Sequence, residues 1–335
     1  MNQHILFVII LIIMKSLSLV PRGIIRNSDK KNIIRRNLGY TSITDEKRND
    51  NEILCLDFDG VICASSTESS VTAIIAAERY WSDFVVKRMN LSNNINEFII
   101  VRDAIGELRP IIETGYENML LARSLLNELR SKGSIDVKNV LNNWNGNYRD
   151  SLLKEYNSDK MDLINAFANC RDYLIENDLR TWISLNPLYP CVNNVLSNIT
   201  PKILDYDIVT TKNARFVKAI LESNQISPPI SCRLYDLEKL TSGEKPFGNK
   251  MNVLKSITND YSIKNDNSIP KVHFVEDRYE TLLSVASNND LNHVQLYLAD
   301  WGYNTIEQRK EAEIHPRIKL INPNSFETLL SKFII

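Results

Sequence analysis

Two aspartates separated by a single residue, Asp57 and Asp59, follow an apolar segment at residues 53–56. This segment predicts a buried strand, and ligands of open α/β sheets bind beyond the carboxyl ends of the strands. Because two carboxylates this close repel each other, the pair favours a bound cation or a shared proton. Gly60 would let the backbone turn sharply here. A plain surface turn, in which Asp and Gly are also common, explains the spacing equally well on its own.

Residues 206–212 place hydroxyl groups at the end of a second expected strand. Thr210 stands at the strand end, and Asn213 suits the N-cap of a helix over residues 214–221. A hydroxyl and free backbone N–H groups at such a junction suit a phosphate oxygen. Thr210 is the first choice and Thr211 the second. Taken alone, a threonine that only closes a strand is the better explanation.

A lysine follows at one of two positions. Lys250 opens a segment whose apolar residues recur at helical spacing, whereas Lys245 precedes a proline in a loop. Most lysines are solvated surface charges. The order of the elements along the chain, and not the residue type, therefore favours Lys250.

Paired acids, Glu276 and Asp277, follow the apolar residues 272–275 and precede a helical pattern over residues 279–286. Carboxylate oxygens are the ligands that Mg²⁺ prefers. Two simpler interpretations remain open. The acids would stabilise the positive end of a helix dipole, or they would form a plain ion pair with Arg278.

In this order the four segments resemble the motifs of the haloacid dehalogenase (HAD) superfamily, beginning with Asp-Phe-Asp-Gly-Val at residues 57–61. The resemblance implies an α/β fold with a Rossmann-like, three-layer core around a parallel sheet and a large inserted helical cap. It assigns residues 49–66 and 200–335 to the catalytic core and residues 67–199 to the cap. The strong helical periodicity and sparse strand signals of the inserted segment agree with a cap.

The resemblance also implies a role for each residue. Asp57 would attack phosphorus and form an aspartyl-phosphate, and Asp59 would protonate the leaving oxygen and later activate water. Thr210 and Lys250 would bind the phosphoryl group. The implied Mg²⁺ ligands are Asp57, Asp277 and Asp59, the last through its backbone carbonyl, with Glu276 acting directly or through water.

Asp59 favours phosphate chemistry over dehalogenation, because a halide leaves without a proton. The Lys-Thr-Gly-Thr sequence of the ion-pumping relatives does not follow Asp57. The expected function is therefore that of a Mg²⁺-dependent phosphatase, a phosphoric monoester hydrolase acting on a small phosphorylated metabolite. The alternative is a non-catalytic binding or assembly protein on the same fold, and a panel of metabolite phosphates would separate the two.

Residues 109–117 combine charges, a proline and a glycine, and they resemble a segment of plant and algal HAD-like proteins. The same group resembles this chain at residues 65–70, 275–278 and 300–304. Arg109 is a candidate site residue, because a guanidinium can bind a carboxylate or a phosphate through two hydrogen bonds. An arginine that braces a helix start is the alternative.

Residues 1–48 are expected to be a targeting leader outside the fold. The apolar run at residues 5–14 fits a signal-peptide core, and the basic, acid-poor stretch after it resembles an organelle transit sequence. This order predicts an organellar protein, with a plastid reached by the secretory route as the candidate destination. Simple secretion and a membrane anchor are the alternatives. No stable membrane association is expected after the leader is removed.

Composition agrees with a folded enzyme. The chain has 335 residues, 43% of them hydrophobic, which suffices for one or two domains with a sizeable core. A net charge of −1 argues against a nucleic-acid-binding protein. The five scattered cysteines show neither a metal-ligand spacing nor a disulfide framework, so free thiols are expected.

Overall fold

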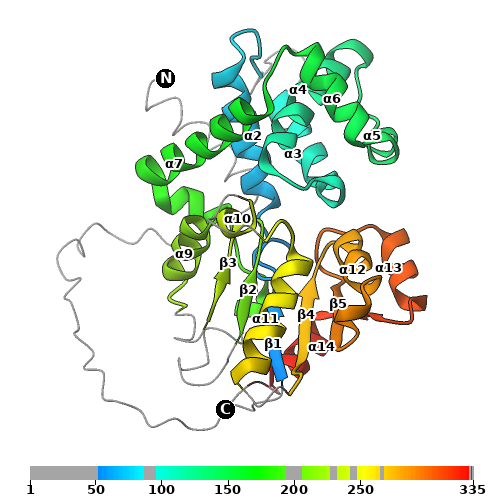
Figure 1. Cartoon of the computed structure of the whole chain (residues 1–335). Helices are drawn as coiled ribbons and strands as arrows, with labels where there is room; N and C mark the ends of the chain where they lie inside the picture. Colours follow the sequence, from blue (N-terminus) through cyan, green and yellow to red (C-terminus); the bar gives the residue numbers. More distant parts are fainter. Residues whose placement is uncertain are drawn as a thin grey trace, which may run out of the picture. The chain divides into compact units, whose positions relative to one another are not determined.

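A computed structural model of the chain describes residues 52–86, 96–193, 206–226, 232–241, 247–264, 268–331 and 333. Six strands, all parallel to their neighbours, form one sheet in the order β3-β2-β1-β4-β5-β6 (Figure 1). This confirms the predicted α/β parallel-sheet core. The strands are β1 (Glu52–Leu56), β2 (Asp207–Val209), β3 (Leu234–Tyr235), β4 (Lys271–Glu276), β5 (Val294–Ala299) and β6 (Ile318–Ile321).

The strand order reverses direction between β1 and β4. From β1 the chain builds outward through β2 and β3, and it then returns to the other side of β1 to build β4, β5 and β6. Open α/β sheets bind ligands at such a switch point, beyond the carboxyl ends of the strands. The register pairs Leu56 with Val275, so the residues that follow these two emerge side by side.

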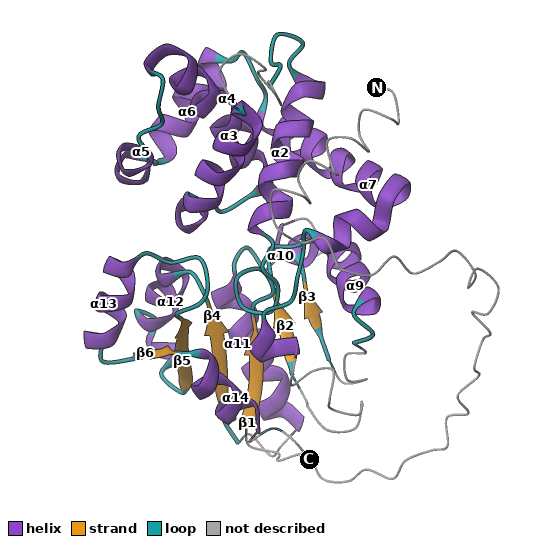
Figure 2. Cartoon of the chain, turned by 180° about the vertical axis from the view of Figure 1, so that it is seen from behind, coloured by secondary structure: helices purple, strands orange, loops and turns teal. Residues whose placement is uncertain are grey.

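Helices cover both faces of the sheet and give the predicted three layers (Figures 1 and 2). Alternate side chains of a strand point to opposite faces. Ile53 and Phe274 therefore pack in the core cluster beneath α11 and α12, whereas His273 contacts Phe333, just beyond α14, on the other face. The core helices are α9 (Ala214–Ser223), α10 (Leu237–Thr241), α11 (Lys250–Lys264), α12 (Tyr279–Ala286), α13 (Ile306–Ile314) and α14 (Pro323–Ser331).

The segment between β1 and β2 is helical in its described residues. Gly133, with φ of +79°, is the left-handed C-cap that ends α4 (Gly115–Lys132). The backbone of α7 (Lys160–Ser184) departs from helical geometry at Asp178. The elements are α2 (Ser66–Tyr80), α3 (Glu97–Glu107), the 3-10 helix η1 (Arg109–Ile111), α4 (Gly115–Lys132), α5 (Val137–Asn143), α6 (Gly146–Glu155) and α7 (Lys160–Ser184).

Residues 1–48 lie outside the described residues, so the leader stays a prediction, as do the proposed boundaries of core and cap. Within the part of the chain that the structure describes, no helix is both long enough and apolar enough to cross a membrane. Four of the five cysteines are buried and all five are free, as expected.

A buried ion pair joins α2 to α7. The Glu68 carboxylate, 0% exposed, accepts hydrogen bonds from Arg171 Nε at 2.8 Å and from a terminal Arg171 nitrogen at 2.6 Å. Trp182 Nε1 and the Thr72 hydroxyl donate to the same carboxylate at 3.1 and 2.7 Å. Burial alone would raise the pKa of Glu68, but the charges of Arg171 and Lys212 and the hydrogen bonds from Arg171 and Thr72 outweigh it and lower the pKa.

Glu68→Gln should therefore lower the free energy of unfolding by about 3 kcal/mol, because Arg171 would be left buried without its counter-charge. Denaturant titration of both chains measures the difference. The matched control is Lys132→Gln, which breaks an exposed pair with Glu128 and should change stability by less than about 1 kcal/mol. Since the pKa of Glu68 is lowered on folding, its contribution is present above its usual pKa of 4.5 and is lost as pH falls through the folded value. Equal effects of the two substitutions would contradict this account.

Candidate active site

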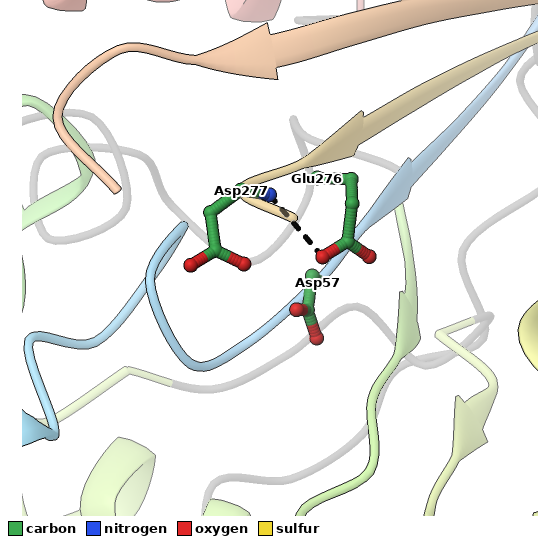
Figure 3. Close-up of side chains that lie close together, drawn as sticks. All are labelled: Asp57, Glu276 and Asp277. Atoms are coloured by element: carbon green, nitrogen blue, oxygen red, sulfur yellow. Dashed lines mark hydrogen bonds between the residues drawn. The ribbon is translucent and has the colours of Figure 1, made fainter. Parts of the chain in front are cut away.

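Three carboxylates meet at the carboxyl ends of β1 and β4 (Figure 3). Asp57 follows β1, Glu276 ends β4 and Asp277 comes next; one oxygen from each lies within 4.8 Å of the others. All three residues are buried. Their proximity follows from the sheet, because the Asp57 backbone N–H continues the ladder by donating to the carbonyl of Val275 at 2.9 Å. The predicted convergence of the first and fourth motifs is thus a consequence of strand pairing.

Lys250, the first residue of α11, reaches into this group. Its Nζ lies 2.9 Å from Asp57 Oδ2 and 2.7 Å from Glu276 Oε2. Lys250 thus lies beside Asp57, and its expected role in binding the phosphoryl group stays a prediction. The alternative, Lys245, lies outside the described residues.

One ammonium group does not compensate three buried carboxylates. Burial and the neighbouring charge of Glu276 raise the pKa of Asp57 to about 7, even with Lys250 in contact. The pKa of Asp277 is likewise raised well above 3.8, by burial and by the charges of Glu276 and Asp57. An opposite charge nearby would reverse both shifts. Buried carboxylate oxygens whose negative charge is not fully compensated suit a divalent cation such as Mg²⁺ as ligands.

Glu276 differs from its two neighbours because protein donors already occupy its oxygens. Oε1 accepts hydrogen bonds from the backbone N–H groups of Asp277 and Arg278 at 3.2 and 3.1 Å, and Oε2 accepts from Lys250. Burial would raise the pKa of Glu276, but Lys250 and the hydrogen bonds outweigh it and lower the pKa. The simple ion pair of Arg278 with these acids is not formed; its side chain instead pairs with Glu113 at 3.3 Å. Glu276 therefore positions Lys250.

The Asp59 side chain is not part of the cluster of three carboxylates. Its Oδ1 accepts a hydrogen bond from Lys212 Nζ at 3.0 Å, and the Lys212 side chain is 0% exposed. Burial would raise the pKa of Asp59, yet the charge of Lys212 and further donors lower it. Only the backbone carbonyl of Asp59 remains a candidate metal ligand, as the resemblance implied.

Sequence reasoning assigned no role to Lys212. The signal was its position within the second motif, three residues beyond Val209, the last residue of β2. Residue type alone could not identify it, because lysines are almost never fully buried unless they are paired. Its acidic partner lies 153 residues away in the chain and is brought close only by the fold.

The two threonines occupy different environments. Thr210, 1% exposed, stands at the end of β2, where its hydroxyl oxygen accepts a hydrogen bond from the Lys212 backbone N–H at 3.0 Å. Thr211 is exposed and lines the cavity described next. Asn213 caps α9 as predicted, with its side chain accepting from the Arg215 N–H. Both threonines lie at the end of β2, where the sequence places them, and neither candidate is excluded.

A cavity of ≈ 890 Å³ opens over these groups. Asp57, Asp59, Lys212, Lys250 and Asp277 line it from the core. The helical segment contributes charged and aromatic side chains, among them Arg109, Tyr116, Phe167 and Arg171. Thr210 and Glu276 are the expected site residues that do not line this cavity, and Glu276 nevertheless lies in the carboxylate cluster beside Lys250.

Two glycines enclose Asp277. Gly60 has φ of +85°, and a Cβ there would lie 1.9 Å from Asp277 Oδ2, so the predicted sharp turn is confirmed. A Cβ on Gly302 would lie 2.3 Å from Asp277 Cβ and 2.7 Å from the Gly60 carbonyl oxygen. The next residue, Tyr303, donates its backbone N–H to Asp277 Oδ2 at 2.8 Å. The carboxylate is therefore held on both sides by backbone.

Solved structures with similar architecture carry names of phosphatases and HAD-like hydrolases. A predicted phosphatase from Clostridium acetobutylicum is 14% identical over 84% of this chain and 99% of its own, with a TM-score of 0.46. A predicted phosphoglycolate phosphatase from Haemophilus somnus is 12% identical over 84% and 98%, with a TM-score of 0.47. A haloacid dehalogenase-like hydrolase from Streptococcus pneumoniae is 11% identical over 83% and 97%, with a TM-score of 0.46.

Neither a family model nor a curated protein matches the sequence. At such low identities and TM-scores, the structural likenesses do not assign an activity to this chain. The resemblance to plant and algal proteins stays a prediction.

Lys212→Met should raise the pKa of Asp59, because the buried carboxylate would lose its closest opposite charge. Carboxyl ¹³C NMR titration, with the Asp59 resonance assigned through Asp59→Asn, measures the shift. The pKa shift is upward, so Asp59 would become ionised only at a higher pH than in the parent. Lys255→Met removes an equivalent partner from the exposed Asp290 and should leave the Asp59 resonance unaffected. An unchanged Asp59 titration in Lys212→Met would contradict the pairing.

Proposed function

We propose that the chain is a Mg²⁺-dependent phosphatase that hydrolyses a small phosphorylated molecule through Asp57. The observation that supports this most directly is the setting of the Asp57 carboxylate. It lies at the carboxyl end of β1 in the wall of a large cavity, 2.9 Å from the Lys250 ammonium. A carboxylate held this way can act as a nucleophile toward phosphorus.

In the proposed reaction an Asp57 oxygen attacks phosphorus, the bond to the leaving oxygen breaks, and an aspartyl-phosphate forms. Water then attacks phosphorus, releasing phosphate and restoring Asp57. Lys250 would orient Asp57 and offset charge on the phosphoryl oxygens, and Glu276 would hold Lys250 in place. Thr210 and Thr211 are the candidate hydroxyl donors to the phosphoryl group. Phosphoryl transfer depends mainly on such positioning and charge compensation.

Mg²⁺ would be held by Asp57, Asp277 and the backbone carbonyl of Asp59. When bound, it would compensate the charge of the buried carboxylates and of the transferring phosphoryl group. The unmatched negative charge at Asp57 and Asp277 is what supports this choice. Asp277 would bind Mg²⁺ without rearranging, because two glycines and the Tyr303 N–H already fix its carboxylate.

Asp59 is proposed as the acid and base of the reaction. The leaving oxygen takes a proton from Asp59 in the first half, and the attacking water returns one in the second. Lys212 favours the ionised carboxylate, which is the form required for the second half. An incoming phosphate brings negative charge close to Asp59 and raises its pKa, which favours the protonated form required for the first half.

Asp57→Asn keeps the shape of the side chain but removes the attacking oxyanion. Hydrolysis of an aryl phosphate by the full chain should fall by about three orders of magnitude or more. Asp83→Asn makes the same chemical change at an exposed carboxylate and should leave the rate unchanged. Turnover by Asp57→Asn at the parent rate would rule out the covalent route. Binding of phosphate esters by the parent without any turnover would instead favour the alternative, a non-catalytic binding protein.

Calorimetric titration of the metal-free chain should show one Mg²⁺ site, and chelation should abolish hydrolysis until Mg²⁺ is restored. Asp277→Asn should weaken Mg²⁺ binding by about tenfold or more. Asp290→Asn, at an exposed carboxylate, is the control and should bind Mg²⁺ as the parent does. Full activity in excess chelator, or undiminished binding in Asp277→Asn, would overturn the metal assignment.

A further inference from the structure

We propose that the cavity contains a second anion-binding subsite centred on Arg109, so that the substrate is a phosphate monoester carrying a further anionic group. This group is a carboxylate or a second phosphoryl group. The inference rests on the proposed phosphatase function, and it narrows the substrate class.

Most of the cations that line the cavity already have an acidic partner. Two of them serve the catalytic carboxylates, and three bind acids elsewhere. Among the described residues, the pairs are Lys212 with Asp59, Lys250 with Asp57 and Glu276, Arg171 with Glu68, Arg215 with Asp172, and Arg278 with Glu113. Arg109 and Lys160 line the cavity without such a partner in the described part of the chain.

These two cations differ in their surroundings. Lys160 is exposed, with its ammonium 5.3 Å from the centroid of the Tyr116 ring, so water can solvate it. Arg109 is half-buried, and its Nε is enclosed without a hydrogen-bond partner. Burying a charged group is costly unless it is paired and hydrogen-bonded. Of the two, Arg109 is therefore the enclosed cation that has no partner among the described residues.

The Arg109 guanidinium stands close to the catalytic carboxylates. It lies 4.6 Å from the centroid of the Tyr303 ring, over its face. Tyr303 donates its backbone N–H to Asp277 Oδ2, and its hydroxyl accepts from the Ser66 N–H at 2.8 Å. The ring is thus fixed at both ends. A small molecule whose phosphoryl group lies against Asp57 can extend its other end toward Arg109.

The backbone that presents Arg109 is also constrained. Pro110 follows Arg109 in η1, and the Ile112 N–H donates to the Arg109 carbonyl at 3.2 Å. One residue later, Glu113 pairs with Arg278, next to Asp277. These contacts fix the segment before any ligand arrives. A pre-positioned planar guanidinium suits a carboxylate or a phosphoryl group, which it binds through two parallel hydrogen bonds.

Two matched pairs of probes test the subsite in the full chain with Mg²⁺. Phosphoglycolate against ethyl phosphate replaces a carboxylate by a methyl group. Propane-1,3-diol bisphosphate against 3-hydroxypropyl phosphate removes only the second phosphoryl group. At least one anionic probe should have a kcat/KM about 10- to 100-fold above its neutral counterpart, the size of effect of a charge-assisted hydrogen bond. The pair that shows the preference identifies the anion.

Arg109→Met should reduce that preference to within about threefold, mainly through KM, and Arg109→Lys should retain part of it because charge remains without the planar fork. Lys160→Met removes the other unpaired cation and should keep the preference. A preference that survives Arg109→Met, or equal kcat/KM values within both pairs in the parent, would overturn the subsite. The parent comparison decides even if a variant fails to fold.

Binding separates failure of the subsite from failure of the phosphatase proposal. Calorimetry on the full chain carrying Asp57→Asn should show tighter binding of the preferred anionic probe than of its neutral counterpart. Adding Arg109→Met should remove the difference. If no phosphate ester is hydrolysed by the parent but this binding difference is found, the subsite stands and the catalytic proposal fails. If phosphate esters are hydrolysed but no binding difference is found, the catalytic proposal stands and the subsite fails.

Discussion

The pairing of β1 with β4 determines the chemistry available to this protein. Once Leu56 stands beside Val275 in the sheet, Asp57, Glu276 and Asp277 must emerge together, and their charges must be compensated. Lys250 compensates part of that charge from the first turn of α11. The hydrophobic packing of α11 and α12 against the sheet keeps these like charges together despite their repulsion.

The buried cations of the site each pair with different carboxylates. Lys250 contacts the proposed nucleophile, and Lys212 contacts the proposed acid and base. The two aspartates have opposite pKa shifts because burial and Glu276 outweigh Lys250 at Asp57, whereas Lys212 and further donors outweigh burial at Asp59. Arg171 is neutralised by Glu68, and its role is to join α2 to α7. Few cations that line the cavity lack an acidic partner among the described residues, and Arg109 is the one of these whose side chain is partly enclosed.

Local patterns in the sequence were sufficient to predict the strand before Asp57, the cap at Asn213 and the helix that begins at Lys250, whereas the three-layer core was implied by the family resemblance. Each of these local features depends on neighbouring residues. The pairing of Lys212 with Asp59, and the use of Glu276 to hold Lys250, depend on contacts between distant segments and could not be read locally.

The enclosure of Asp277 by Gly60 and Gly302 has a consequence for how this protein can vary. Neither glycine has a functional group, yet even a methyl group at either position would collide with the aspartate or with the opposite turn. Among related chains that keep the same chemistry, these two positions should be as invariant as the acid between them. Steric exclusion would thus leave the same evolutionary record as catalysis, and only the geometry around Asp277 distinguishes the two causes.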